Sequence, residues 1–124
     1  MDLKEWTKHF VEYRHSHRKE LQDIEQKDNK IIATLKQKQT TYTITKILEI
    51  TSENIVCLNT KSNFEFLIKN WDEFVSKDAT IFFVNNKKNS YWAIKPSHHQ
   101  KIIEKKTLKQ GLKTLFESSE ILNE

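Results

Sequence analysis

The sequence predicts an α+β fold: an antiparallel meander sheet of about five to six strands, with a long N-terminal helix, a short middle helix and a C-terminal helical segment. Apolar residues recur every three or four positions near both ends of the chain and every second position through most of its middle, which are the periods of a helix and of a strand. Asparagines punctuate the middle, and asparagine suits turns. With 124 residues and no internal repeat or linker, the chain is predicted to form a single domain over residues 1–124.

A long amphipathic helix is predicted over residues 3–27. Asp2 and Glu5 have the spacing of an N-cap residue and its partner in the first turn. Large side chains then follow at intervals of three and four, and these are Leu3, Trp6, Phe10, Tyr13, His17, Leu21 and Ile24. The helix would be roughly 37 Å long at 1.5 Å per residue. We expect it to pack on its own sheet, with a length that would also allow part of it to pair with a second copy.

Strands are predicted where the period changes to two. The segments are 32–36, 41–50, 55–59, 64–69, 80–85 and 91–95. The first four are interpreted as a meander of antiparallel neighbours, and the last two as a hairpin around residues 86–90. Between the meander and the hairpin, Asn70 and Glu73 repeat the capping pattern and start a short helix that carries Trp71 and Phe74.

Two further capping patterns follow Pro96. They are Ser97 with Gln100 and Thr107 with Gln110. The C-terminal segment is therefore predicted to be either two short helices or one bent helix. The apolar stripe of its second part is formed by Leu108, Leu112, Leu115 and Phe116. Gly111 lies inside this part, where glycine costs about 1 kcal/mol relative to alanine, so we expect it to permit close packing.

The composition excludes several classes of function. Gly111 is the single glycine, so neither the P-loop nor the dinucleotide-binding fingerprint can be built, and no cofactor is predicted. The single cysteine, Cys57, lies in an apolar run and is expected to be a buried, unreactive thiol. One cysteine also excludes a disulfide within the chain and a multi-cysteine zinc site. With no apolar run of about 18 residues and no signal-peptide pattern, we expect a cytoplasmic protein without a membrane partner.

The excess of positive charge lies in the last third of the chain. Eight lysines and one acid occur between Asn85 and Phe116, whereas the rest of the chain has more acids than bases and the whole carries a net charge of +4. Lysines displace counterions from phosphates, and an exposed aromatic ring can stack on a base. Nucleic acid is therefore the predicted ligand. The candidate nucleic-acid-binding residues are Lys87, Lys88, Lys95, His98, His99, Lys101, Lys105, Lys106, Lys109, Lys113 and Trp92.

The surroundings of these lysines limit the hypothesis. Both arginines, Arg14 and Arg18, lie far away in the sequence, although arginine is the better residue for bidentate recognition of bases and phosphates. Attraction to the backbone is thus favoured over sequence readout. Tyr91 and Trp92 point to opposite faces of their strand, so at most one is available for stacking. The alternative is that the lysines only solvate a surface helix.

No catalytic or metal-binding residues are predicted. Glu12 and His15 form a single Glu-x-x-His unit with no second copy in the sequence, whereas a di-iron bundle needs two. The adjacent His98 and His99 diverge on a helix and cannot face one ligand. No serine has a recognisable nucleophile elbow around it.

The order of helix, antiparallel strands, helix and strand resembles the core of restriction-endonuclease-like proteins. The resemblance implies an acid on one strand and a Glu-x-Lys or Asp-x-Lys on the next, where carboxylates hold Mg²⁺ and the lysine assists the attacking water. The nearest candidates are Glu49, Glu65 and Lys69. On a strand, Glu65 and Lys69 would share a face about 13 Å apart. Glu104 and Lys106 have the spacing of the motif but lie in a helical stretch.

These patterns predict a small binding module without catalytic chemistry of its own and with nucleic acid as its favoured ligand. A protein-interaction or homo-oligomerising adaptor is the alternative, in which the N-terminal helix forms a homodimer. A divergent nuclease is the second alternative, so enzymatic activity stays open while a non-catalytic role is favoured.

Overall fold

The computed structural model describes residues 2–16, 20–51, 53–100 and 105–118. The described elements are α1 (Leu3–Ser16), β1 (Leu21–Lys27), β2 (Lys30–Leu35), β3 (Gln39–Ile44), β4 (Asn54–Leu58), α2 (Lys61–Lys69), α3 (Trp71–Ser76), β5 (Thr80–Asn85), β6 (Ser90–Ile94), α4 (Pro96–Gln100) and α5 (Lys105–Ser118). Within these ranges the six strands form one sheet in sequence order. The predicted α+β fold is confirmed.

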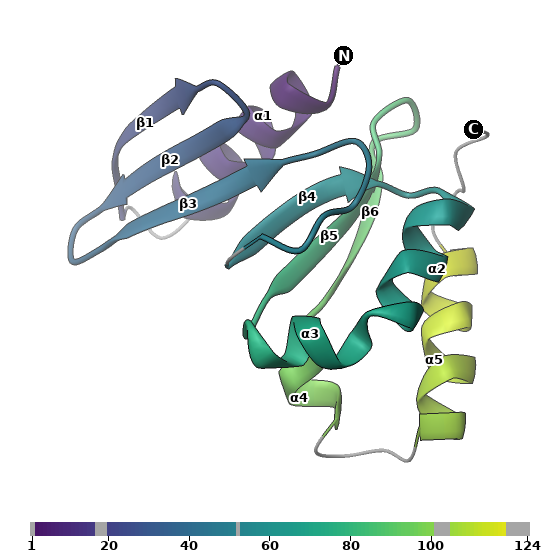
Figure 1. Cartoon of the computed structure of the whole chain (residues 1–124). Coiled ribbons are helices and arrows are strands. Elements are labelled where there is room, and N and C mark those ends of the chain that lie inside the picture. Colours follow the sequence, from purple (N-terminus) through teal and green to yellow (C-terminus); the bar gives the residue numbers. More distant parts are fainter. Residues whose placement is uncertain (1, 17–19, 52, 101–104, 119–124) are drawn as a thin grey trace.

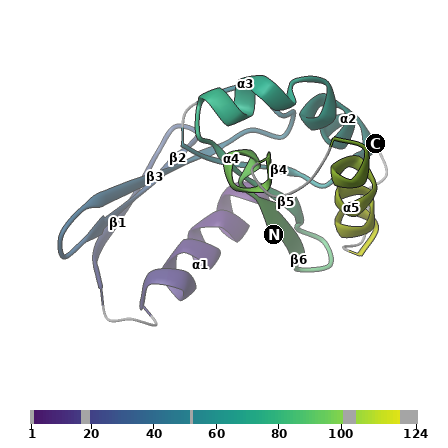
Figure 2. The ribbon, with the colours of Figure 1, turned by 90° about the horizontal axis from the view of Figure 1, so that it is seen from below.

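The molecule has three layers, with the sheet in the middle (Figures 1 and 2). Helix α1 covers one face, and α2, α3 and α5 cover the other. Strands β4 and β5 supply both layers, because their side chains alternate between the faces. Ile55 and Phe83 pack toward α2 and α5, whereas Val56 and Phe82 pack toward α1. None of the described helices is long and apolar enough to cross a membrane.

The sheet is mixed, which differs from the predicted antiparallel meander. Strands β1, β2 and β3 are antiparallel neighbours, and so are β5 and β6. Strand β3 pairs in parallel with β4, and β4 pairs in parallel with β5. Parallel neighbours need a crossover, and helices α2 and α3 supply the one between β4 and β5.

The segment 64–69 is helical, so its prediction as a strand was wrong. Thr60 caps α2, and its hydroxyl oxygen accepts a hydrogen bond from the Asn63 backbone N–H at 3.2 Å. Phe64 and Leu67 are buried one turn apart. Phe66 and Ile68 pack partly against the same core, which is why the apolar residues look alternating in the sequence.

Helix α1 ends at Ser16, so the prediction of one helix over 3–27 was too long. Leu21 and Ile24 lie on β1 and both pack against the core under α1. They are three residues apart, and an irregularity in the β1–β2 register between Leu21 and Asp23 lets both face that core. The bulge in β1 therefore gives Leu21 and Ile24 a spacing that is also typical of a helix.

Helices α4 and α5 occupy the described parts of the predicted C-terminal helical segment. Leu112 and Phe116 attach α5 to the core, where the Phe116 ring stacks on Phe64 at 4.6 Å between centroids. Gly111 is exposed, and a Cβ at this position would meet nothing within 4 Å. Close packing is therefore not what requires a glycine here, contrary to the sequence-based expectation.

Asn63 ties the connection between β3 and β4 to helix α2. This buried side chain accepts a hydrogen bond from the Leu48 N–H at 2.8 Å. Its amide nitrogen donates to the Lys46 and Leu58 carbonyl oxygens, both at 2.8 Å.

Cys57 on the neighbouring strand is buried as predicted, and burial raises the pKa of its thiol well above the usual value, which makes it unreactive.

Candidate functional site

The predicted lysine-rich surface is divided in the structure. Lys87 and Lys88 lie at the tip of the β5–β6 hairpin, whereas Lys95 and His98 lie beyond the opposite end of β6. The five residues of β6 span about 16 Å. Lys95 Nζ is 3.6 Å from Asp78 Oδ2, so an acid faces this lysine. The two groups therefore belong to different places on the molecule.

The remaining lysines of the prediction belong to the C-terminal segment. Lys113 is exposed on α5, and its Nζ is 3.9 Å from Glu117 Oε1. Because α5 packs on the face opposite α1, Lys113 lies on another layer from the hairpin tip. The part that the structure describes leaves out Lys101 and the side chains of His99, Lys105, Lys106 and Lys109.

Trp92 is a core residue, which corrects its prediction as a nucleic-acid-binding residue. Its ring stacks on Phe83 with centroids 4.4 Å apart, and its Nε1–H donates to Asn59 Oδ1 at 2.9 Å. Trp92 is only 6% exposed. Its neighbour Tyr91 points to the other face of the strand, where it is 46% exposed and is the ring available to a ligand.

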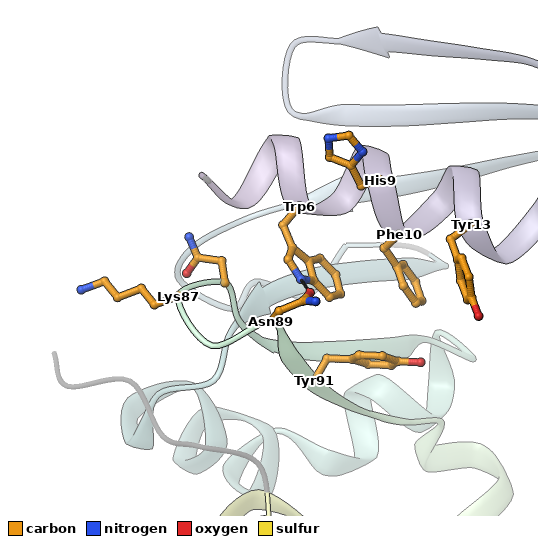
Figure 3. A pocket seen from close by; sticks show the side chains of 8 residues that line it. Trp6, His9, Phe10, Tyr13, Lys87, Asn89 and Tyr91 are labelled. Carbon is orange, nitrogen blue, oxygen red and sulfur yellow. Dashed lines mark hydrogen bonds between the residues drawn. The ribbon is translucent and has the colours of Figure 1, made fainter.

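A hollow of about 690 Å³ opens between α1 and the β5–β6 hairpin, on the same side of the sheet as Tyr91 (Figure 3). We call it the aromatic groove. It is lined by Trp6, His9, Phe10, Tyr13, Asn86, Lys87, Asn89 and Tyr91. A pocket of this size falls in the range that holds a small organic ligand or part of a larger one.

Helical spacing brings the rings of α1 to one wall of the groove. Trp6, Phe10 and Tyr13 follow each other at intervals of four and three residues and so share a face. Trp6 and Phe10 stack with centroids 5.1 Å apart, and both meet Tyr91 at steep angles, at 5.7 and 5.0 Å. These contacts hold Tyr91 while leaving much of its ring open. Tyr13 is 73% exposed at the end of the row.

The hairpin tip is held beside α1 by asparagines. Asn89 Oδ1 accepts a hydrogen bond from Trp6 Nε1–H at 2.8 Å. Asn89 has a positive φ of 52°, which asparagine tolerates better than most residues. Asn85 Oδ1 accepts from the Lys87 and Lys88 backbone N–H groups, each at 3.1 Å. The turn that carries the two lysines is therefore fixed at the mouth of the groove.

A second hollow of about 510 Å³ adjoins the aromatic groove and shares Asn86 and Lys87 with it. Lys46 and the exposed Ile47 also line it. Its lining contains one acid, Asp2, whose carboxylate caps α1 by accepting from the Glu5 N–H at 2.8 Å. The lysine shared by the two hollows is Lys87, and Lys46 is a second lysine in the lining of the adjoining one.

A cation also lies behind the aromatic row. The Arg14 guanidinium is 5.9 Å from the Phe10 ring centroid and 5.5 Å from that of Phe82, within the range of cation–π attraction. His15 and Tyr42 lie further along, with His15 Nε2 2.9 Å from the Tyr42 hydroxyl. Burial raises the pKa of Tyr42, although Arg14 opposes the shift. This tyrosine stays a neutral structural group.

The residues suggested by the nuclease resemblance are not placed as that resemblance implies. Glu65 and Lys69 are one turn apart on helix α2, not on a strand, and Glu49 lies in the connection between β3 and β4. Glu104 and the side chain of Lys106 lie outside the described residues. Among the residues described, no group of three or more histidine, cysteine, aspartate or glutamate side chains is placed to hold a metal ion.

Sequence reasoning had identified both halves of the aromatic groove but assigned them to different functions. The helix with Trp6, Phe10 and Tyr13 was expected to pack on the sheet or, in the alternative, to form a protein-interaction surface, and the hairpin lysines were predicted as a nucleic-acid surface. Their meeting depends on contacts between Trp6 and Asn89, 83 positions apart, which no local pattern reports. Asn86, Asn89 and His9 were not predicted as site residues.

Comparison of the chain with protein-family models, with curated proteins and with solved structures gives no match. The geometry of the aromatic groove therefore carries the functional argument.

Proposed function

We propose that this protein is a small, non-catalytic nucleic-acid-binding module whose ligand enters the aromatic groove. The observation that supports this proposal is the junction of two exposed tyrosine rings, Tyr13 and Tyr91, with the lysine-bearing hairpin tip. Bases stack on aromatic rings, and phosphates are attracted to lysines that release counterions on binding.

The predicted ligand, nucleic acid, is thus proposed to bind at the aromatic groove and not at the whole lysine-rich surface expected from the sequence. Lys87 and Lys88 remain as the proposed phosphate contacts, because Lys87 lines the groove and Lys88 follows Lys87 in the same turn. Lys95 and Lys113 each lie near a carboxylate elsewhere on the molecule. The aromatic partner becomes Tyr91 instead of Trp92. Lysines without arginines at the tip favour attraction to the backbone over reading of the base sequence.

Salt dependence tests the proposal. Affinity for a fluorescein-labelled mixed-sequence 15-nucleotide DNA is measured by anisotropy between 50 and 200 mM NaCl for the wild type and for Lys87→Gln/Lys88→Gln. We expect affinity to fall with salt, and the magnitude of the slope of log K against log salt to be about 1.4 smaller in the variant, since each lost phosphate contact removes about 0.7.

Lys27→Gln/Lys30→Gln is the matched control. These two exposed lysines flank the β1–β2 turn, at the opposite edge of the sheet. The control variant should keep the wild-type slope. Absence of measurable binding by the wild type at 50 mM NaCl would end the proposal, and equal slopes in the two variants would remove Lys87 and Lys88 from it.

The homodimer alternative has lost the argument that motivated it. Helix α1 has 14 residues instead of the expected 25 or so, and its Leu3, Trp6 and Val11 are buried against the protein's own sheet. The exposed Tyr13 is one of the residues that line the aromatic groove. The cytoplasmic location stays a prediction.

A further inference from the structure

The tyrosine rings of the aromatic groove are exposed enough to stack on an unpaired base. Figure 3 shows Tyr91 below the rings of Trp6 and Phe10, with Tyr13 beside them at the end of the row. Tyr13 is 73% and Tyr91 46% exposed. In a duplex each base is stacked between its neighbours and offers only its edges in the grooves, whereas a single strand can turn a base face toward an aromatic side chain.

The hairpin tip is poorly built for the alternative of entering a duplex groove. The major groove is about 12 Å wide and admits one helix or one two-stranded ribbon. The β5–β6 tip is such a ribbon, but the hydrogen bond from Trp6 to Asn89 holds α1 directly beside it. A helix with its side chains is itself about 10–12 Å across, so the tip and α1 cannot enter the groove together.

Charge supports a polyanion that passes over the tip and turns a base inward. Lys87 is shared by the aromatic groove and the adjoining hollow, whose lining also holds Lys46 and the Asp2 carboxylate that caps α1. The acidic Glu12 next to the aromatic row faces His9, with 4.0 Å between its carboxylate and the ring nitrogen. Lys87 and Lys46 therefore lie along the path on which a phosphate backbone would run, with the tyrosines at its side.

From these features we infer that the aromatic groove selects single-stranded over double-stranded nucleic acid, by stacking an unpaired base on Tyr13 and Tyr91. The inference rests on the proposed function, which by itself does not say which form of nucleic acid is bound. Selection arises because stacking adds to the phosphate attraction only when a base is unpaired. A stacked base contributes on the order of 1–3 kcal/mol by alanine substitution, equivalent to roughly 5- to 150-fold in affinity.

The test compares one 15-nucleotide sequence in three forms, as single-stranded DNA, as single-stranded RNA and as the blunt DNA duplex, at 50 mM NaCl. The wild type should bind at least one of the single strands about tenfold or more tightly than the duplex. Tyr13→Ala/Tyr91→Ala should lose about that factor for the preferred single strand and keep both its duplex affinity and its salt slope. Tyr13→Phe/Tyr91→Phe retains the rings and should bind as the wild type does.

The outcomes separate the inference from the proposed function. Equal binding of single strands and duplex overturns single-strand selection, and single-strand binding that survives Tyr13→Ala/Tyr91→Ala overturns selection by stacking on these tyrosines; both outcomes leave nucleic-acid binding in place. Binding of none of the three forms overturns the proposed function itself. Tyr13 is exposed, whereas Tyr91 is half-buried against Trp6 and Phe10, so a melting temperature well above that of the binding assay shows that a loss of affinity is not a loss of fold.

Discussion

The two faces of the sheet are covered to different extents. On one face α2, α3 and α5 close a continuous core that includes Phe74, Phe83 and Trp92. On the other face α1 is the one described helix of the layer; it packs mainly over β1 to β4 and meets β6 through the contacts of Trp6 and Phe10 with Tyr91, whose ring stays 46% exposed. The aromatic groove opens on this face. The same strand, β6, thus contributes Trp92 to the core on one face and leaves Tyr91 46% exposed on the other, where we propose that the ligand binds.

The largest expected change in stability distinguishes an aromatic residue of the closed face from one of the open face. Phe74→Ala removes a fully buried ring from the closed face and should lower the free energy of unfolding by about 3–5 kcal/mol. Tyr13→Ala, at the open face, should change it by less than about 0.5 kcal/mol. Urea denaturation measures both. A cost for Tyr13→Ala close to that for Phe74→Ala would show that this part of the open face belongs to the core.

A smaller effect of opposite sign is expected at Gly111. Gly111→Ala should stabilise the protein by about 1 kcal/mol, because alanine is the better helix former and its Cβ would meet nothing within 4 Å. Thermal unfolding against the wild type measures the change. If the variant were less stable, α5 would approach another part of the protein at this glycine, and the closed face would be packed more tightly there than the structure describes.

The smallest effect concerns the surface contact between Asp78 and the residues around the end of β6. The Ser97 hydroxyl hydrogen bond, at 2.6 Å, and then the Lys95 charge lower the pKa of Asp78. A lowered pKa means that the stabilisation is present above the unfolded-state pKa near 3.8 and is lost as pH falls through the folded-state value. Asp78→Asn tolerates the positive φ of 52° at this position.

Asp78→Asn should therefore be less stable than the wild type at pH 7, and the difference should shrink toward pH 3. Urea midpoints at the two pH values measure it. A difference that is the same at both values would mean that the Asp78 carboxylate charge has no part in joining α4 to the end of α3.

Local patterns predicted elements on both faces of the sheet and also failed on both. The strand at residues 80–85 was predicted with the bounds that β5 has, because it is an apolar run between clear turns. Phe64, Phe66 and Ile68 misled the prediction of 64–69, since a helix buried on several sides also shows apolar residues at every second position. In β1 a bulge gave a strand the spacing of a helix.

The candidate site was less predictable for a physical reason. Alternation shows that Tyr91 and Trp92 point in opposite directions, but which one is buried depends on which helices cover each face. Likewise, eight lysines in one stretch of sequence need not share a surface, since a strand carries Lys88 and Lys95 to opposite ends of β6. The groove exists because Trp6 meets Asn89 across the fold.

The most direct test of the account is the salt dependence of single-strand affinity, measured side by side for the wild type, Lys87→Gln/Lys88→Gln and Tyr13→Ala/Tyr91→Ala. We expect the lysine variant to lose slope and the tyrosine variant to lose affinity at an unchanged slope, because phosphates and bases are bound by different side chains of one groove. Wild-type binding that neither substitution alters would contradict the assignment of the ligand to the open face.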